Sequence, residues 1–369
     1  MKKLNVFFPV PRIYGPSLHE TKNKLFEYGK DFAKEADDWI DADVIVLQLI
    51  GDPDRKNLVH PSEVVFSDLI KVIMDNMNHI PTIVFPLCNI NNTSNWRYLF
   101  ENASMIYSYL DVDYQIKHVD GQLLPFVFNK SVVVREPLGV EPGDFFREDD
   151  MQKQYLIYTF GFDKETESID IIFDATVLFN STRENLGLPI LKMLHSGRDF
   201  GFDSKYYQFE TPAPQNQKGI VRARYNSSYF ANALRADAWV EGGFEMANIE
   251  APLCGCQPIT YNFECYQHWF KGISEFVNVP LNTDPRSLSN RKHVVEQLVN
   301  IFNRGTNGRD KIYKYTVSVN DSDDEDEKTK EIGSKLDLFD DKRNMIYERF
   351  LWENVASTFW KEVLNKCAK

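Results

Sequence analysis

Two series of short apolar runs, each alternating with helix-length amphipathic segments, constrain the fold of this 369-residue chain more than any other feature. Such runs are typical of buried strands in a parallel sheet whose crossover connections are helices. The first series begins at Leu4 and the second begins near residue 155. At roughly 100–200 residues per domain, the length fits two domains. The sequence therefore predicts a two-domain α/β protein.

Apolar periodicity and turn residues place the expected elements along the chain. In the first series we expect strands at 4–10, 43–49, 82–87 and 105–109, and helices at 18–34 and 67–77. In the second series we expect strands at 155–160, 190–195, 236–240 and 257–261, and helices at 169–179, 227–234, 244–253 and 291–304. An apolar stripe predicts a terminal helix that docks on another surface; it consists of Trp352, Val355, Ala356, Phe359 and Val363.

The charge balance and the apolar pattern narrow the classes of partner. Acidic residues outnumber basic ones by 54 to 42, which gives a formal net charge of −12. This counts against nucleic acid as a partner, although a local basic patch could still bind one. The sequence has no apolar stretch long enough to span a membrane and no signal-peptide pattern, so we expect a cytoplasmic protein, in the host cytoplasm if the chain is viral. The five cysteines lack metal-site spacing, so we expect free thiols and no metal.

Four segments, in family order, resemble the retaining GT-B glycosyltransferases. Residues 135–145 resemble their interdomain segment, and residues 158–172 resemble the strand, glycine and helix that open their second domain. Residues 236–259 are the most specific match, to the glutamate-containing donor motif of family 4-like second domains, and residues 350–356 resemble the closing helix. Residues 248–255 resemble a phage DNA alpha-glucosyltransferase about as well. The first half of the chain matches only in its strand–helix rhythm.

This resemblance implies two Rossmann-like domains that face a cleft, with a C-terminal helix that crosses back to the first domain. The expected boundaries are 1–145 for an acceptor domain, 146–345 for a nucleotide-sugar domain and 346–369 for the terminal helix. The implied activity is retaining, metal-independent transfer of a sugar from a UDP- or GDP-linked donor to a glycan or a small hydroxyl acceptor. No cofactor is implied beyond the donor substrate itself.

The expected donor site begins at Gly242. Glycines let a backbone approach a ligand, and a helix N-terminus presents unpaired N–H groups to an anion, so we expect a diphosphate where helix 244–253 begins. The resemblance implies that Glu250 accepts hydrogen bonds from ribose hydroxyls and that Glu241 contacts the donor sugar, with Glu245 as the alternative. The donor-side candidates are Gly161, Gly242, Gly243, Phe244, Glu245 and Glu250.

The basic clamp of the family is altered in this sequence. The family has an arginine after the glycine equivalent to Gly161 and a lysine five residues later, and these cations neutralise the diphosphate leaving group. Here the two positions hold Phe162 and Glu167, and the cations that could replace the clamp are Lys164 and Arg198. The three candidate catalytic residues are therefore Lys164, Arg198 and Glu241. The alternatives are a catalytically silent GT-B module that binds a sugar nucleotide or a partner, and a viral DNA-base glucosyltransferase.

Acceptor-side candidates follow two strands of the first series. Arg12, Tyr14 and Gly15 come after the first strand, and Asn89 comes after the strand at 82–87. Since the carboxyl ends of parallel strands form the ligand-facing edge of such a sheet, these residues are expected to contact the acceptor or a phosphate. A purely structural turn is an equal alternative at 12–15.

Overall fold

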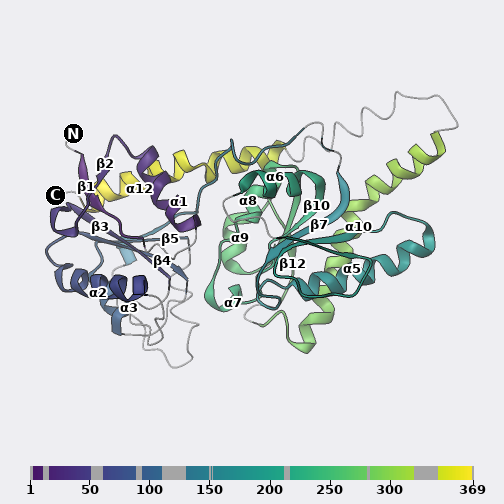
Figure 1. The fold of residues 1–369 in the computed structure, drawn as a ribbon, viewed down its shortest axis with the longest axis horizontal. Coiled ribbons are helices and arrows are strands. Elements are labelled where there is room, and N and C mark those ends of the chain that lie inside the picture. Colours follow the sequence, from purple (N-terminus) through teal and green to yellow (C-terminus); the bar gives the residue numbers. More distant parts are fainter. Residues whose placement is uncertain are drawn as a thin grey trace. The chain divides into compact units, whose positions relative to one another are not determined.

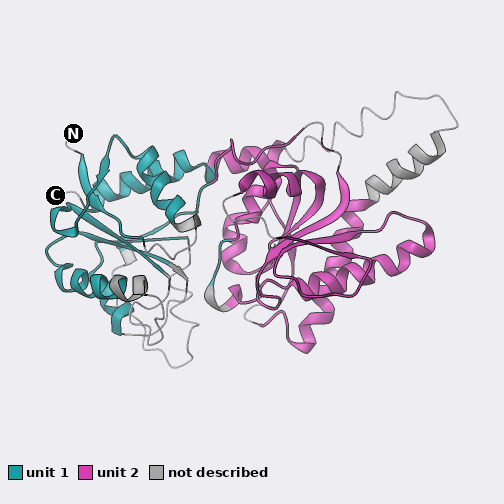
Figure 2. Ribbon diagram, viewed as in Figure 1, with its two compact units in different colours: residues 1–139, 240–244, 349–369 teal, residues 140–239, 245–348 magenta. Residues whose placement is uncertain are grey.

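Figure 1 presents the fold of this computed structural model, which describes residues 3–10, 16–50, 61–88, 94–109, 130–148, 151, 153–211, 217–280, 283–319 and 340–367. The chain divides into two compact units, coloured separately in Figure 2. Unit 1 comprises Met1–Gly139, Val240–Phe244 and Arg349–Lys369, and unit 2 comprises Val140–Trp239 and Glu245–Glu348.

Unit 1 is built on a sheet of six parallel strands in the order β2-β1-β3-β4-β5-β6. Most of its residues are apolar and fully buried, because helices cover both faces of the sheet (Figure 1). The strand order reverses between β1 and β3, which is the place where ligands bind in open α/β sheets. The strands are β1 (Leu4–Phe7), β2 (Ala33–Glu35), β3 (Val44–Ile50), β4 (Thr82–Cys88), β5 (Met105–Ser108) and β6 (Val133–Arg135).

The helices of unit 1 include the last helix of the chain. They are α1 (Pro16–Tyr28), α2 (Pro61–Asn76), α3 (Ser94–Asn102) and α12 (Trp352–Cys367). Trp360 on α12 donates its indole N–H to the carbonyl of Leu25 on α1 at 2.6 Å. The ring of Phe359 meets Tyr107 of β5 edge-on at 4.9 Å. The apolar stripe expected from the sequence therefore docks on the N-terminal sheet and its first helix.

Unit 2 holds a second sheet of six parallel strands, in the order β12-β11-β10-β7-β8-β9. This is the Rossmann order, with the reversal between β7 and β10. The strands are β7 (Gln154–Gly161), β8 (Lys192–Gly197), β9 (Tyr207–Glu210), β10 (Ser228–Asn232), β11 (Gln257–Tyr261) and β12 (Glu275–Val277).

Helices surround the sheet of unit 2 (Figure 1). They are α5 (Ile169–Arg183), α6 (Lys218–Ser227), α8 (Ala247–Leu253), α9 (Glu264–Phe270), α10 (Leu288–Val319) and a helix at 340–350. Arg286 binds Asp170 at the start of α5 through two hydrogen bonds of 2.8 Å, and Arg291 of α10 adds a third at 2.7 Å. These bonds lower the pKa of Asp170, against the opposing effect of its burial. They fix the start of α5, and with it the loop that follows β7.

The expected α/β class is confirmed, and the structure is a two-domain GT-B fold, but four local predictions are wrong. The helix expected at 18–34 ends at Tyr28, and residues 33–35 form β2. Residues 227–234 were expected to be helical, yet 228–232 form β10, and α7 (Ala238–Glu241) occupies most of the expected strand 236–240. Because β10 is central and buried on both faces, its apolar run lacks the alternation that distinguishes a strand from a buried helix. The helix expected from Phe244 begins at Ala247, after Gly242 takes a φ of 70°.

Candidate functional site

The switch point of the second sheet brings together the loops that leave β7 and β10. Asn232, at the end of β10, donates its side-chain amide to the carbonyl of Glu167 at 2.9 Å. The backbone N–H of Ala236 donates to the carbonyl of Thr166 at 2.6 Å. These bonds hold the two loops together at the carboxyl edge of the sheet, where α/β proteins of this order bind ligands.

Two glycines allow close packing at this edge of the sheet. Gly161 ends β7 and pairs with Gly197 at the end of β8. Gly197 has a φ of 118°, and a Cβ there would collide with the carbonyl of Gly161. A Cβ on Gly161 would collide with the carboxyl group of Glu167. Only glycine suits either position, because neighbouring protein atoms already occupy the space that a Cβ would need.

Two cations lie next to this glycine edge. Lys164, in the loop after β7, and Arg198, directly after Gly197, are both exposed. Within the described ranges, neither side chain forms an ion pair. By contrast, Arg222 and Arg224 of α6 pair with Glu148 at 3.0 Å and Glu210 at 2.7 Å. Lys164 and Arg198 are therefore the cations at this edge that remain available to an anion.

Two aromatic rings stand beside the same edge. Phe160 is 37% exposed and Phe162 is 49% exposed, and their centroids lie 5.5 Å apart in an edge-on arrangement. Large apolar side chains this exposed at a strand end can cover the face of a sugar ring or a base. Phe162 stands where the related enzymes have an arginine, so this position supplies an apolar surface instead of a charge.

Glu167 is the unusual group of the site. Its Oε2 accepts the backbone N–H of Asp163 at 3.0 Å, directly above Gly161. Burial raises the pKa of this carboxyl to about 7, and the nearby Glu245 adds to the rise. Arg235 and the backbone N–H groups of Asp163 and Phe162 oppose the rise. A carboxyl with this pKa carries a proton for part of the time at neutral pH.

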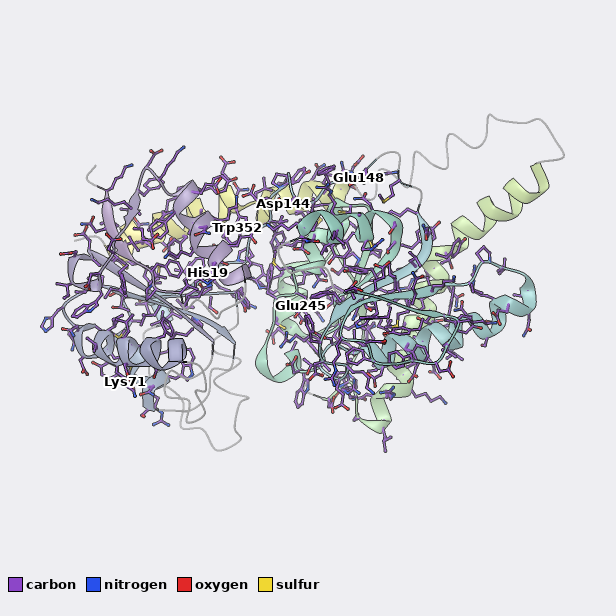
Figure 3. All side chains as sticks on the ribbon, in the orientation of Figure 1. His19, Lys71, Asp144, Glu148, Glu245 and Trp352 are labelled. Atoms are coloured by element: carbon purple, nitrogen blue, oxygen red, sulfur yellow. The ribbon has the colours of Figure 1, made fainter. Side chains whose placement is uncertain are left out.

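An ion cluster from the loop after β10 lies next to Glu167. Arg235 binds Asp237 at 2.8 Å and lies 3.7 Å from the carboxylate of Glu245, which is labelled in Figure 3. Burial raises the pKa of Glu245, while the guanidinium of Arg235 lowers it. Glu245 is thus held by an arginine that sequence analysis did not single out.

Glu250 is the fourth residue of α8 and is half-buried. The hydroxyl of Tyr225, a buried residue of α6, donates to Glu250 Oε2 at 3.5 Å. The end of α8 is fixed by Lys153, whose Nζ donates to the carbonyls of Cys254 at 3.0 Å and Tyr225 at 2.8 Å. The carboxylate therefore projects from a short helix that is anchored at its far end.

The start of α8 offers fewer backbone donors than the sequence suggested. The N–H of Asn248 already donates to the carbonyl of Glu245 at 3.0 Å, and those of Ile249 and Glu250 donate to Met246 at 2.9 and 3.0 Å. These bonds satisfy groups that would otherwise face an anion. The glycine edge of β7 and β8 is therefore the better place for a diphosphate.

The remaining predicted residues fall in unit 1 or outside the described part of the chain. Gly242, Gly243 and Phe244 are buried, and the ring of Phe244 lies 5.7 Å from that of Tyr109. The side chain of Glu241 lies outside the described residues. So do the acceptor-side candidates Arg12, Tyr14, Gly15 and Asn89.

Sequence analysis missed Tyr225, Asn232 and Arg235 as members of the site. All three flank or follow β10, which the apolar pattern had assigned to a helix, so the loop carrying Arg235 was not recognised as a strand-end loop. The signal that could have found it is the short run 228–232, with the charged residues Arg235 and Asp237 soon after it. The described residues contain no cluster of three or more His, Cys, Asp or Glu that could hold a metal ion, and the described thiols Cys254, Cys256, Cys265 and Cys367 are free. No described helix combines the length and apolar character needed to cross a bilayer.

No protein-family model matches this sequence, and a comparison with curated proteins finds no match. Solved structures do match it. The Anabaena protein HepE, in complex with UDP and glucose, has a TM-score of 0.57 at 9% identity over 98% of this chain and 99% of its own. An alpha-glucosyltransferase in complex with UDP and a 13-mer DNA containing a HMU base has a TM-score of 0.52 at 11% identity over 100% of both chains.

The pneumococcal O-GlcNAc transferase GtfA, in complex with UDP and GlcNAc, has a TM-score of 0.53 at 12% identity over 88% of this chain. The present chain spans little more than half of that protein, 56% of its length. At these identities the likenesses show a shared fold, that of the GT-B glycosyltransferases, over the whole of the present chain.

Proposed function

We propose that this chain is a glycosyltransferase that moves a sugar from a nucleotide-diphosphate donor to an acceptor hydroxyl. The observation that carries the proposal is the switch point of the second sheet. There, two strand ends that are glycine, Gly161 and Gly197, lie beside two cations, Lys164 and Arg198, that have no acidic partner among the described residues. This is the chemistry that an anionic diphosphate needs.

In this proposal Glu250 binds the ribose of the nucleotide. One carboxylate can accept hydrogen bonds from two vicinal hydroxyls, and Tyr225 orients the carboxylate from the opposite side. The resemblance of 236–259 to the donor motif supports the same role. Solved structures of the same fold contain UDP, which favours a uridine nucleotide over GDP as the donor.

The diphosphate lies over Gly161 and Gly197, between Lys164 and Arg198. When the bond between the sugar and the diphosphate breaks, negative charge develops on the leaving phosphate, and fixed cations there lower the barrier.

The reaction proceeds with retention and without a metal, as the resemblance implies, with Glu241 at the donor sugar. Gly242, Gly243, Phe244 and Glu245 line the donor, while unit 1 binds the acceptor through Arg12, Tyr14, Gly15 and Asn89.

Calorimetry with UDP and GDP tests the donor site. Glu250→Gln weakens the binding of the preferred nucleotide by about 1–3 kcal/mol, because the amide cannot accept from both ribose hydroxyls. Glu264→Gln, an exposed glutamate in the first turn of α9, is the matched control and leaves the affinity unchanged. Equal affinity in wild-type protein and Glu250→Gln removes the ribose role from this residue.

A turnover assay separates an enzyme from a silent binding module. The silent module is the alternative because Phe162 and Glu167 replace the basic clamp of the family that the sequence resembles. UDP-glucose is supplied with glycans, small hydroxyl compounds and DNA containing hydroxymethylated bases, and release of UDP is measured. We expect release that depends on one acceptor class. Nucleotide binding without turnover on any acceptor favours the silent module, and turnover on the DNA alone identifies a base-glucosylating enzyme like the structural neighbour.

A further inference from the structure

The carboxyl group of Glu167 occupies the centre of the proposed diphosphate site. It lies above Gly161, in space that exists only because glycine has no Cβ. Its loop is rigidly built: Asp163 Oδ1 accepts the N–H groups of Glu165 and Thr166, both at 2.9 Å, and Asn232 binds the carbonyl of Glu167. The carboxyl is therefore fixed in the place that a diphosphate approaches.

This carboxyl has a backbone partner but no cation of its own. In the part of the chain that the structure describes, no lysine or arginine forms an ion pair with Glu167. Arg235, whose charge lowers the pKa of Glu167, is already engaged with Asp237 at 2.8 Å. The charged side chains that act on Glu167 are Arg235, after β10, and Glu245, before α8.

The balance of these groups disfavours a negative charge at this position. Partial burial removes water from the carboxylate, and Glu245 places a second negative charge nearby. A diphosphate at Gly161 would add further negative charge to the same place. The favourable arrangement is a neutral carboxylic acid, which becomes a hydrogen-bond donor.

We infer that Glu167 binds the donor as a protonated acid and donates a hydrogen bond to a diphosphate oxygen. This rests on the function proposed above and adds a residue to that same site. Oε2 keeps its bond from the N–H of Asp163, and the protonated oxygen faces the phosphate.

The consequence is a donor affinity that depends on pH. Burial raises the pKa of Glu167 to about 7, so the binding-competent acid is the main form below neutral pH and is lost above it. The wild-type Kd for UDP-glucose then rises about 30-fold from pH 6 to pH 8.5. UDP-glucose is the suitable probe because its diphosphate, esterified at both ends, does not titrate in this range. GDP-glucose is measured in parallel.

Glu167→Gln is the decisive variant. Its amide has nearly the shape of the acid, can accept from Asp163 and donates at every pH. Calorimetry should give a Kd that stays within about threefold of the wild-type value at pH 6 across the whole range. Glu167→Ala, which cannot donate, binds UDP-glucose about tenfold more weakly at pH 6. Glu165→Gln, an exposed neighbour on the same loop, keeps the wild-type pH profile.

Glu245→Gln provides a second measurement that a merely structural role would not produce. Removing this negative charge lowers the pKa of Glu167, so the midpoint of the pH profile moves to lower pH while the profile persists. An unchanged midpoint contradicts the assignment of the profile to Glu167.

The outcomes distinguish a failure of the role assigned to Glu167 from a failure of the proposed function. A flat wild-type profile, a Glu167→Gln profile that follows the wild type, or tighter binding by Glu167→Ala overturns the role of Glu167 and leaves the donor site in place. The last result would mean that the carboxylate only blocks the site. Failure of folded wild-type protein to bind either nucleotide sugar at any pH overturns the proposed function itself.

Discussion

At the scale of single residues, Lys164 and Arg198 supply the positive charge that attracts the diphosphate in the proposed donor site. Both are exposed, and neither has an acidic partner in the described ranges. We expect Lys164→Ala and Arg198→Ala each to weaken UDP-glucose binding by about 1 kcal/mol, and to reduce its dependence on salt concentration.

Lys192→Ala is the matched control for these two variants. Lys192 is an exposed lysine at the opposite, amino-terminal end of β8, so its removal changes the net charge equally without touching the site. Titrations at low and high salt distinguish a local contact from a general effect of charge. If all three variants lose the same affinity, the site does not lie at the carboxyl edge of the sheet.

At the scale of elements, the paired strand ends of β7 and β8 depend on glycine. In Gly197→Ala the new Cβ would meet the carbonyl of Gly161, and a φ of 118° would strain any L-residue. We expect a loss of about 3 kcal/mol or more in the free energy of unfolding, measured by chemical denaturation. Gly201→Ala, also at positive φ but with open space around it, costs only about 1 kcal/mol. A smaller loss at 197 than at 201 would contradict the close approach.

Single helices and strands also show most clearly which parts of the fold the sequence predicts and which it does not. Residues 257–261 were expected as a strand and are β11, and the stripe on 352–363 was expected to dock and does, on unit 1. β10 was misassigned because a strand buried on both faces has no two-residue alternation. The misassignment hid Arg235, whose position in a strand-end loop depends on the pairing of β10 with β7. Pairing is a long-range property that local pattern does not contain.

At the scale of the whole molecule, the last helix completes the first unit. Gly29 leaves room for the indole of Trp360, which is fully buried and hydrogen-bonded to Leu25. We expect Trp360→Ala to destabilise unit 1 by about 3–5 kcal/mol. Hydrogen exchange should show lost protection in β1 and β3, with β7 and β8 unaffected. Lys361→Ala, on the exposed face of α12, should leave both units unchanged.

A uniform loss of protection across both units in Trp360→Ala would contradict this division of the chain. Loss confined to unit 1 would show that the donor-binding unit holds its fold without help from the terminal helix. Binding of UDP would then persist in the variant, because every residue that we place on the diphosphate and the ribose lies in unit 2.

The central claim is that a nucleotide sugar binds at the switch point of the second sheet. A crystal structure of the chain grown with UDP tests it most directly. We predict the ribose hydroxyls on the carboxylate of Glu250 and the diphosphate above Gly161 and Gly197, within reach of Lys164, Glu167 and Arg198. Nucleotide density anywhere else on the chain, with no contact between the nucleotide and the Glu250 carboxylate, would contradict the account.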